Sequence, residues 1–377
     1  MKITRIETTP LRVPYRTVFH WAQGVIEAAE VILVEVHTDG GLIGYGESMN
    51  SASPVAVQAL LKEAATICLG HSPFEVNSLM RQAYKHLFAA RGTCSAPRFG
   101  ALVLAGLDMA LWDLMGKFAN RPVYDLLGGA ARDRIHYFGF PQGDTPEEIA
   151  EEARQWADRG CDVIYVKIGR GADLDLSIVK HVRAAVGDHR LRLDANEAWD
   201  VLTARRMLEK LKHYDIEFIE QPTNSDSLQA LSQVKAMSPI AVAADQIAFT
   251  PEDVYAVCRA KAADLIVLGL HETGGIGRFC KAAAIAEAAG LNVCLHGLYE
   301  TGITTCATYQ VGVSLDNLDD GNQYMNHLLV YDIIKRPDLS LQKGGVPLLP
   351  GPGLGFELDF EAVERAAENY NRMVHRR

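Results

Sequence analysis

LRLDAN (residues 191–196), EFIEQP (217–222) and IAVAADQ (240–246) are three short apolar runs, each with a carboxylate at or near its end. The carboxylates are Asp194, Glu220 and Asp245, which are separated by 26 and 25 residues (194 to 220, and 220 to 245). This separation accommodates one strand, one returning helix and two short loops. Because the carboxyl ends of successive strands meet at one mouth of a parallel barrel, the three acids are predicted to converge there.

Three uncompensated carboxylates a few ångströms apart would repel one another, and a hard divalent cation with oxygen ligands relieves that repulsion. We therefore predict that Asp194, Glu220 and Asp245 bind Mg²⁺. Asn196 and Gln246 lie beside the first and third of these acids. We expect both to contact the substrate, with Asn196 also supporting the metal site. For any single acid the alternative is a place in a turn or a helix cap, but the equal spacing over three units favours a metal site.

The next candidate is Lys167 in VIYVKIG (163–169). Alternation along a strand puts Tyr165 and Lys167 on one face, with Lys167 nearer the mouth. Desolvation in a dry cleft disfavours the ammonium form, so such a lysine can act as a neutral base. We predict that Lys167 removes a proton from the substrate and that Tyr165 contacts the substrate. The alternative for Lys167 is a surface lysine at a strand end.

His296 in NVCLHGLYE (292–300) ends a further candidate strand. A histidine beside a metal site can act as an acid or a base near neutral pH, so His296 is a candidate catalytic residue. The alternative is a strand-end histidine that is only hydrogen-bonded. His271 and Glu272, just past the preceding strand, are interpreted as loop residues.

Beyond about residue 135, short apolar runs alternate with amphipathic helices, which favours an α/β fold built as a closed parallel barrel. The predicted strands are IHYFGF (135–140), DVIYVKIG (162–169), RLRLDAN (190–196), IEFIEQP (216–222), IAVAAD (240–245), ADLIVLGL (263–270) and NVCLHG (292–297). Residues 1–127 are predicted to form a separate α+β unit, and 128–345 the barrel. The tail, 346–377, is expected to return to the N-terminal unit.

Within the N-terminal unit, alternation predicts a small antiparallel sheet of about three strands, followed by helices near 54–69, 74–88 and 100–118. The segment TVFHWAQGVIEAA (17–29) is expected to be a loop, and SMNSAS (48–53) another. Both are possible lids over the barrel mouth. His20, Trp21 and Asn50 are therefore candidate substrate contacts, with ordinary packing as the alternative.

Composition restricts the function classes. The chain has 377 residues, of which 48% are hydrophobic and 22% charged, as in an ordinary soluble globular protein. A net charge of −10 argues against nucleic acid and anionic membranes as partners. Seven scattered cysteines without a CxxC pair, and no signal-like or 18-residue apolar run, predict a reduced cytoplasmic protein. We expect a homo-oligomer that acts on a small carboxylic acid.

The chain also resembles a known family. GLDMALWDLMGKFANRPVYDLLGG (106–129), the Lys167 strand, LRLDAN, FIEQP and PGLGFELD (352–359) are similar, in this order, to the mandelate racemase and muconate lactonising enzyme family of the enolase superfamily. The resemblance implies a modified (β/α)₇β barrel of the TIM type with an N-terminal α+β capping domain. It also implies Mg²⁺ held by Asp194, Glu220 and Asp245, and removal of the proton α to a substrate carboxylate to give an enediolate.

Three positions depart from the family pattern: Tyr165, Gly269 and Gln246, the last in place of the usual glutamate. Tyr165-Val166-Lys167 stands where Lys-x-Lys is frequent, and Gly269 stands where the muconate type has a lysine and the mandelate type an aspartate. His296 matches the mandelate type, but without that aspartate as a partner. An unpartnered histidine is a better acid than base, so we predict dehydration of a small hydroxy acid, such as a sugar acid, to a 2-keto acid. The alternatives are a racemase, epimerase or cycloisomerase, and a catalytically silent binding protein.

Overall fold

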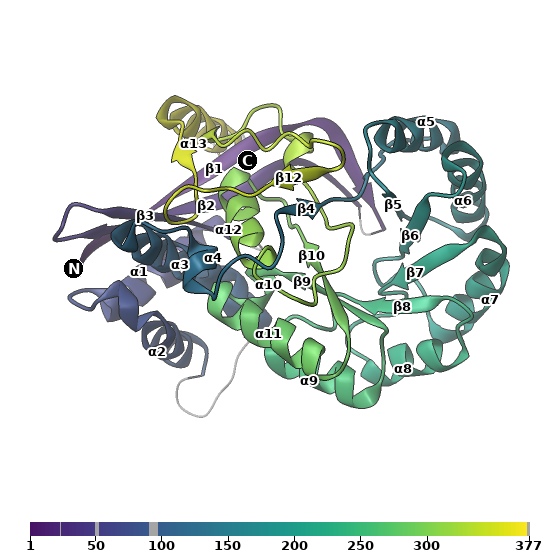
Figure 1. The fold of residues 1–377 in the computed structure, drawn as a ribbon, viewed down its shortest axis with the longest axis horizontal. Helices are drawn as coiled ribbons and strands as arrows, with labels where there is room; N and C mark the ends of the chain where they lie inside the picture. Colours follow the sequence, from purple (N-terminus) through teal and green to yellow (C-terminus); the bar gives the residue numbers. More distant parts are fainter. Residues whose placement is uncertain (23, 50–52, 90–96, 375–377) are drawn as a thin grey trace.

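The computed structural model describes residues 1–22, 24–49, 53–89 and 97–374, arranged as a small sheet-and-helix domain beside a barrel (Figure 1). The N-terminal sheet is antiparallel, with the order β1 (Ile3–Trp21), β2 (Gly24–Thr38), β3 (Ile43–Met49). The helices α1 (Pro54–Cys68), α2 (Val76–Phe88) and α3 (Pro97–Ala119) follow the sheet. The predicted strands and helices of this domain are confirmed.

The long helix α3 forms the centre of the N-terminal domain. Its segment Arg98–Ala119 is long and apolar enough to cross a membrane, but 83% of the most apolar window is buried inside the fold. It packs so closely on β3 that a Cβ added to Gly46 would lie 1.9 Å from the Gly106 carbonyl oxygen. Glycine is therefore required at this crossing, and α3 is a core helix of this domain.

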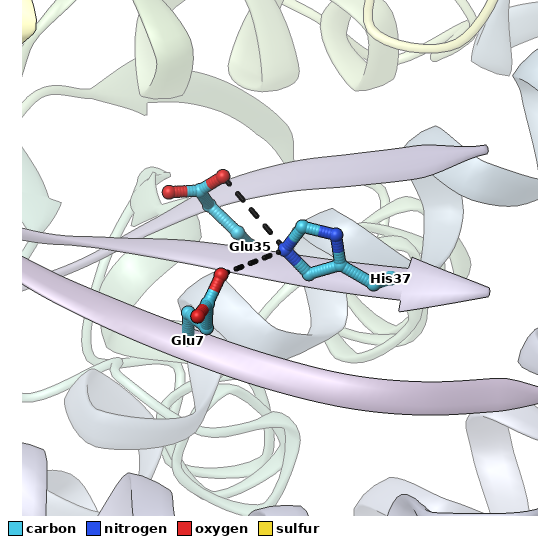
Figure 2. A group of neighbouring side chains, drawn as sticks. All are labelled: Glu7, Glu35 and His37. Carbon is cyan, nitrogen blue, oxygen red and sulfur yellow. Dashed lines mark ion pairs between the residues drawn. The ribbon is translucent and has the colours of Figure 1, made fainter. Parts of the chain in front are cut away.

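Charged pairs mark the register of the β1–β2 hairpin. Glu7 lies opposite Glu35, and Arg5 opposite His37. Figure 2 shows the His37 ring between the two glutamates, with Nε2 3.0 Å from Glu7 Oε2 and 4.0 Å from Glu35 Oε2. Arg5 Nη2 lies 3.3 Å from Glu7 Oε2, so an arginine already balances this partly exposed group. The two glutamates repel each other across the hairpin, and Arg5 and His37 offset this repulsion, so the group contributes little to stability.

The tip of this hairpin differs from the prediction. Residues 17–29 were expected to form a loop, whereas β1 continues to Trp21 and β2 begins at Gly24. Phe19 pairs with Ile26, and His20 pairs with Val25. Aromatic and β-branched residues on both arms favour pairing, and a register shift after Pro14 restores the ladder. The segment over the barrel mouth is therefore a strand hairpin.

The barrel domain is organised around a six-stranded parallel sheet, in the order β10-β9-β8-β7-β6-β5. Its strands are β5 (Val163–Lys167), β6 (Arg190–Asp194), β7 (Ile216–Glu220), β8 (Ala241–Ala244), β9 (Leu265–Gly269) and β10 (Asn292–His296). The helices before, between and after them are α5 (Pro146–Asp158), α6 (Ala172–Val186), α7 (Val201–Leu211), α8 (Leu228–Met237), α9 (Pro251–Ala260), α10 (Leu270–Thr273), α11 (Ile276–Ala288) and α12 (Gly302–Gly312). These strands and helices confirm the predicted repeating βα pattern.

Two irregular segments, around residues 137–139 and 318–322, close the barrel between β5 and β10. Parallel bridges join Gly139 to Ile164, Tyr137 to Asn322, and Val293 to Leu318. The segment expected as the first barrel strand, 135–140, therefore forms isolated bridges. Its first two residues, Ile135 and His136, belong to the short β4 (Arg134–His136), which pairs antiparallel with β12 (Gly345–Pro347). The result is a capped TIM-type barrel, as predicted.

The C-terminal tail lies against the N-terminal hairpin. β11 (Ile334–Arg336) pairs with β13 (Glu357–Leu358), and α13 (Phe360–Val374) packs along β1 (Figure 1). Asn369 Nδ2 donates to the Arg12 carbonyl oxygen at 3.5 Å. The exact domain boundaries at residues 127 and 345 stay a prediction.

Candidate active site

The three predicted acids lie together at the carboxyl ends of adjacent strands. Asp194 ends β6 and is paired in register with Glu220, which ends β7, while Asp245 directly follows β8. All three side chains are buried. The similar spacing in the sequence thus corresponds to the carboxyl ends of three consecutive parallel strands, with Asp245 two residues beyond the register of Glu220.

Side chains from β5 hold the first two acids. The Tyr165 hydroxyl lies 2.6 Å from Asp194 Oδ2 and 2.8 Å from Glu220 Oε1, so its single hydrogen serves one carboxylate at a time. Lys167 Nζ donates to the same Asp194 oxygen at 2.5 Å. The backbone N–H of Asn196 donates to Asp194 Oδ1 at 2.7 Å. Tyr165 therefore positions the carboxylates of Asp194 and Glu220. It does not line the cavity, so the predicted contact of Tyr165 with the substrate is not supported.

The chemistry of this group fits a hard divalent cation. Both carboxylate oxygens of Asp245, Asn196 Oδ1 and Gln246 Oε1 are buried without a hydrogen-bond donor among the described residues. Burial and the charges of Asp194 and Asp245 raise the pKa of Glu220 well above its usual range. Burial, together with the charges of Glu272 and Asp194, raises the pKa of Asp245 to about 7, although His296 opposes this shift. Buried, mutually repelling oxygen donors are the environment that Mg²⁺ stabilises.

Lys167 and His296 line one cavity of about 230 Å³ beside the carboxylates. Lys167 comes from β5 and His296 from β10, the two edge strands of the six-stranded sheet, while the three acids lie on strands between them. Both side chains are almost fully buried. The structure thus brings the predicted base and the predicted histidine to one site, on different sides of it.

His296 has a carboxylate partner, which corrects the prediction. Its Nδ1 lies 2.9 Å from Glu272 Oε2 and 3.3 Å from Asp245 Oδ1. Because Nδ1 carries one hydrogen, the shorter contact assigns it to Glu272 and leaves Asp245 free for a cation. Burial alone would lower the pKa of His296, but the charges of Asp245 and Glu272 outweigh it and raise the pKa to about 10.

Glu272 was interpreted as a loop residue because it lies three positions beyond the strand end. In the structure it belongs to the single helical turn α10, which brings residue 272 back over residue 269. A Cβ added to Gly269 would lie 2.1 Å from Glu272 Oε2, so the glycine leaves room for this carboxylate. The sequence did contain a signal for this contact. Gly269 and Glu272 are three residues apart, which is the spacing at which side chains on one helical turn lie over one another.

The remaining predicted contacts divide into two groups. Trp21, Asn196 and Gln246 line the cavity. His20 does not, because its ring is directed to Asp144, with Nε2 3.1 Å from Oδ1. Asn50 lies outside the described residues.

Most of the lining was not anticipated from the sequence, because it comes from segments distant along the chain. The unpredicted residues that line the cavity are Phe19, Met49, Leu102, Glu197, Phe249, Glu272, Gly297, Leu298, Tyr299, Gln323 and Met325.

Another missed residue, Gln221, orients the third acid. Its Oε1 accepts from the amides of Asp245, at 3.1 Å, and Ile247, at 3.3 Å, and its Nε2 donates to the Thr223 carbonyl at 2.8 Å. Gln221 directly follows Glu220 in EFIEQP and has a φ of 34°. This bend turns its side chain toward the neighbouring strand, which a regular strand pattern would not predict.

Two family models match this chain. The family model described as mandelate racemase/muconate lactonizing enzyme, N-terminal domain, matches residues 3–128. The model described as enolase C-terminal domain-like matches residues 148–363. Together they cover most of the chain.

Individual relatives are isomerases. Muconate cycloisomerase 1 of Rhodococcus opacus is 30% identical, over 98% of this chain and 99% of the relative. Hydrophobic dipeptide epimerase of Enterococcus faecalis is 30% identical, over 81% of this chain and 86% of the relative. The crystal structure of the dipeptide epimerase from Enterococcus faecalis V583, complexed with Mg and the dipeptide L-Leu-L-Tyr, superposes with a TM-score of 0.85 at 26% identity, over 95% of this chain and all of that one. The chain therefore belongs to the mandelate racemase/muconate lactonizing enzyme family of the enolase superfamily.

Proposed function

We propose that the protein is a Mg²⁺-dependent isomerase, which racemises or epimerises a carboxylic acid by moving the proton on its α-carbon. One observation carries this proposal: Lys167 and the His296–Glu272 pair line a single cavity from opposite edges of the parallel sheet. A racemase needs two groups that can each accept and return the α-proton, and the carboxylate beside His296 makes it a competent second base.

In this mechanism each side chain has one task. Lys167 Nζ takes the α-proton from one side, and His296 Nε2 delivers a proton from the other. Glu272 accepts from His296 Nδ1, which orients the ring and stabilises its protonated form. Asp194, Glu220 and Asp245 would hold Mg²⁺, which when bound supplies Lewis-acid stabilisation of the charge that develops on the substrate carboxylate. Tyr165 fixes two of these ligands from beneath.

The cavity lining favours a substrate with an apolar substituent. Apolar and aromatic side chains dominate it: Phe19, Trp21, Met49, Leu102, Phe249, Leu298, Tyr299 and Met325. Apart from Lys167 and His296, the lining residues that the structure describes include no cation for a second carboxylate. A highly hydroxylated sugar acid would leave several hydroxyls against apolar surface. The relative named hydrophobic dipeptide epimerase is consistent with this choice.

Dehydration of a hydroxy acid is the second candidate, because one observation favours it. The charges of Asp245 and Glu272 raise the pKa of His296 to about 10, which favours the protonated ring, a group that can protonate a departing β-hydroxyl. The original reason for preferring dehydration, a histidine without a carboxylate partner, no longer holds. Racemisation or epimerisation therefore takes precedence.

A screen in D₂O with Mg²⁺ tests the proposal. Hydrophobic dipeptides such as L-Leu-L-Tyr, N-acyl amino acids, aromatic 2-hydroxy acids and sugar acids are incubated separately, and proton NMR follows the α-hydrogen. We expect exchange and the opposite configuration at the α-carbon for an apolar substrate. Formation of a 2-keto acid would favour the dehydratase. Absence of exchange across the panel would favour a silent binding protein.

We also propose that the enzyme is cytoplasmic and forms a homo-oligomer. Six described cysteines form no disulfide, which supports the reducing cytoplasm. Assembly as a homo-oligomer remains proposed, and size-exclusion chromatography with light scattering would test it.

A further inference from the structure

A second cavity, of about 470 Å³, lies behind a wall of the active site. The wall is the segment 323–327, whose side chains alternate between the two spaces. Gln323 and Met325 line the active-site cavity, while Tyr324, Asn326 and His327 line the second one. The second cavity is therefore separate from the catalytic site, although it shares backbone with it.

Two guanidinium groups face this second cavity without a carboxylate partner. Arg16 Nε donates to the Leu329 carbonyl at 2.8 Å, and the Arg159 guanidinium lies 5.0 Å from the Trp156 ring centre. Within the described part of the chain, neither arginine has an acid within ion-pairing distance. Their positive charges remain available to a ligand.

The carboxylate in the lining, Asp332, is already engaged and does not neutralise the arginines. Its Oδ1 accepts from the amides of Gly302, at 3.0 Å, and Ile333, at 2.7 Å. Its Oδ2 accepts a short hydrogen bond from Asn326 Nδ2. Asp332 therefore caps α12, and the net charge offered by the cavity is positive.

His327 lines the cavity with an uncharged ring. Both ring nitrogens are buried, and among the described residues the Tyr324 backbone is the hydrogen-bonding group that raises the pKa of this ring. The ring stacks on Tyr324, with centroids 5.8 Å apart, and meets Trp156 edge-on at 4.9 Å. Burial, and then the charges of Arg159 and Arg16, lower the pKa of His327 to about 4. At neutral pH the ring is therefore neutral and leaves the positive charge of the cavity to the two arginines.

We propose that this cavity is a binding site for a small organic carboxylate. Two guanidiniums without acid partners provide the charge complement, since planar guanidinium groups hydrogen-bond carboxylates in a bidentate manner. The neutral ring of His327 and the rings of Trp156 and Tyr324 form a wall for the body of the ligand. Neither the catalytic cavity nor its carboxylates take part.

Calorimetric titration of the intact protein with benzoate, in the millimolar range, tests the site. Arg159→Ala and Arg16→Ala should each weaken benzoate binding about tenfold, the loss of one charge-assisted contact. The matched control is Arg154→Ala, on the same helix, where the arginine pairs with Glu151 and Asp158. It should bind benzoate as the native chain does. Binding at this site should also persist in Asp245→Ala, whose altered group is in the other cavity.

Three results would overturn the assignment. One is the absence of benzoate binding. Another is binding that Asp245→Ala abolishes and Arg159→Ala leaves unchanged, which would place it in the active site. The third is tighter binding of inorganic phosphate than of benzoate, which would exclude an organic carboxylate as the preferred ligand. Melting curves of the variants check that each one is folded.

Discussion

At the scale of single residues, Glu272 decides how His296 works. The carboxylate reaches Nδ1 from one helical turn beyond the strand, through space that Gly269 leaves open. The strand pattern of the sequence predicts the positions of Asp194, Glu220, Lys167 and His296, because side chains alternate between the two faces of a strand. The same pattern does not predict Glu272, because this residue lies in a helical turn after the strand has ended.

Glu272→Gln tests this pairing. The amide keeps the shape of the side chain but loses its charge, so the protonated form of His296 is less stabilised. We expect kcat to fall by about 10²-fold or more, with a small change in KM. The pH at which activity falls on the histidine limb should move downward. Glu287→Gln, an exposed change on α11, serves as the control. A loss of stability without any shift in the pH profile would assign Glu272 a purely structural role.

Asp245→Ala tests the metal site. Removing one of three buried, repelling carboxylates should abolish Mg²⁺ binding measured by calorimetry. The metal-free variant should unfold at the same temperature as the metal-free native protein or at a higher one, because like-charge repulsion is relieved. Glu252→Ala, at an acid near the start of α9, should keep native affinity. Undiminished Mg²⁺ affinity in Asp245→Ala would remove this residue from the site.

At the scale of elements, the sequence predicts the barrel strands well and the hairpin tip poorly. Each strand from β5 to β10 is a compact apolar run between turn residues. The local sequence pattern is sufficient to locate such a run. The tip of β1 and β2 depends on pairing between Phe19 and Ile26 across a register shift. Such pairing is not visible in either arm alone, so the segment resembles a loop.

Gly46→Ala tests the closest contact between elements. The new methyl group would meet the Gly106 carbonyl at 1.9 Å, so β3 and α3 must separate. Overpacking of this kind costs about 1–3 kcal/mol, and the melting temperature should fall accordingly. Gly40→Ala is the matched control, since a Cβ there meets nothing within 4 Å. Equal melting temperatures for both variants would contradict the close packing.

At the scale of the whole molecule, a buried polar cluster joins the N-terminal domain to the barrel. The Glu47 carboxylate accepts from the Thr301 amide at 3.0 Å and from Thr304 Oγ1 at 2.9 Å. Its carbonyl accepts from His271 Nε2 at 2.8 Å, and His271 precedes Glu272 on α10. This contact between the domains therefore also helps to fix the turn that positions His296. The sequence could not predict this, since the contacts join residues more than 200 positions apart.

This cluster makes stability depend on pH. Burial raises the pKa of Glu47 to about 7, above its ordinary value of 4.5. The folded state therefore holds this proton more tightly than the unfolded state. The stabilisation is fully present below pH 4.5 and is lost as pH rises to about 7. Glu47→Gln should remove up to about 3 kcal/mol of this dependence, as measured by denaturant unfolding at several pH values. An unchanged slope would mean that Glu47 titrates normally.

We propose that Lys167 and His296 exchange protons with opposite sides of one substrate α-carbon. The direct measurement is exchange of the α-hydrogen in D₂O from each enantiomer of the substrate that the screen identifies. Lys167→Ala should lose exchange from one enantiomer and retain it from the other, and His296→Asn should show the reverse pattern. Both variants should fail to interconvert the enantiomers. If one variant abolished exchange from both enantiomers while the other abolished neither, or if water were lost instead, the two-base account would be wrong.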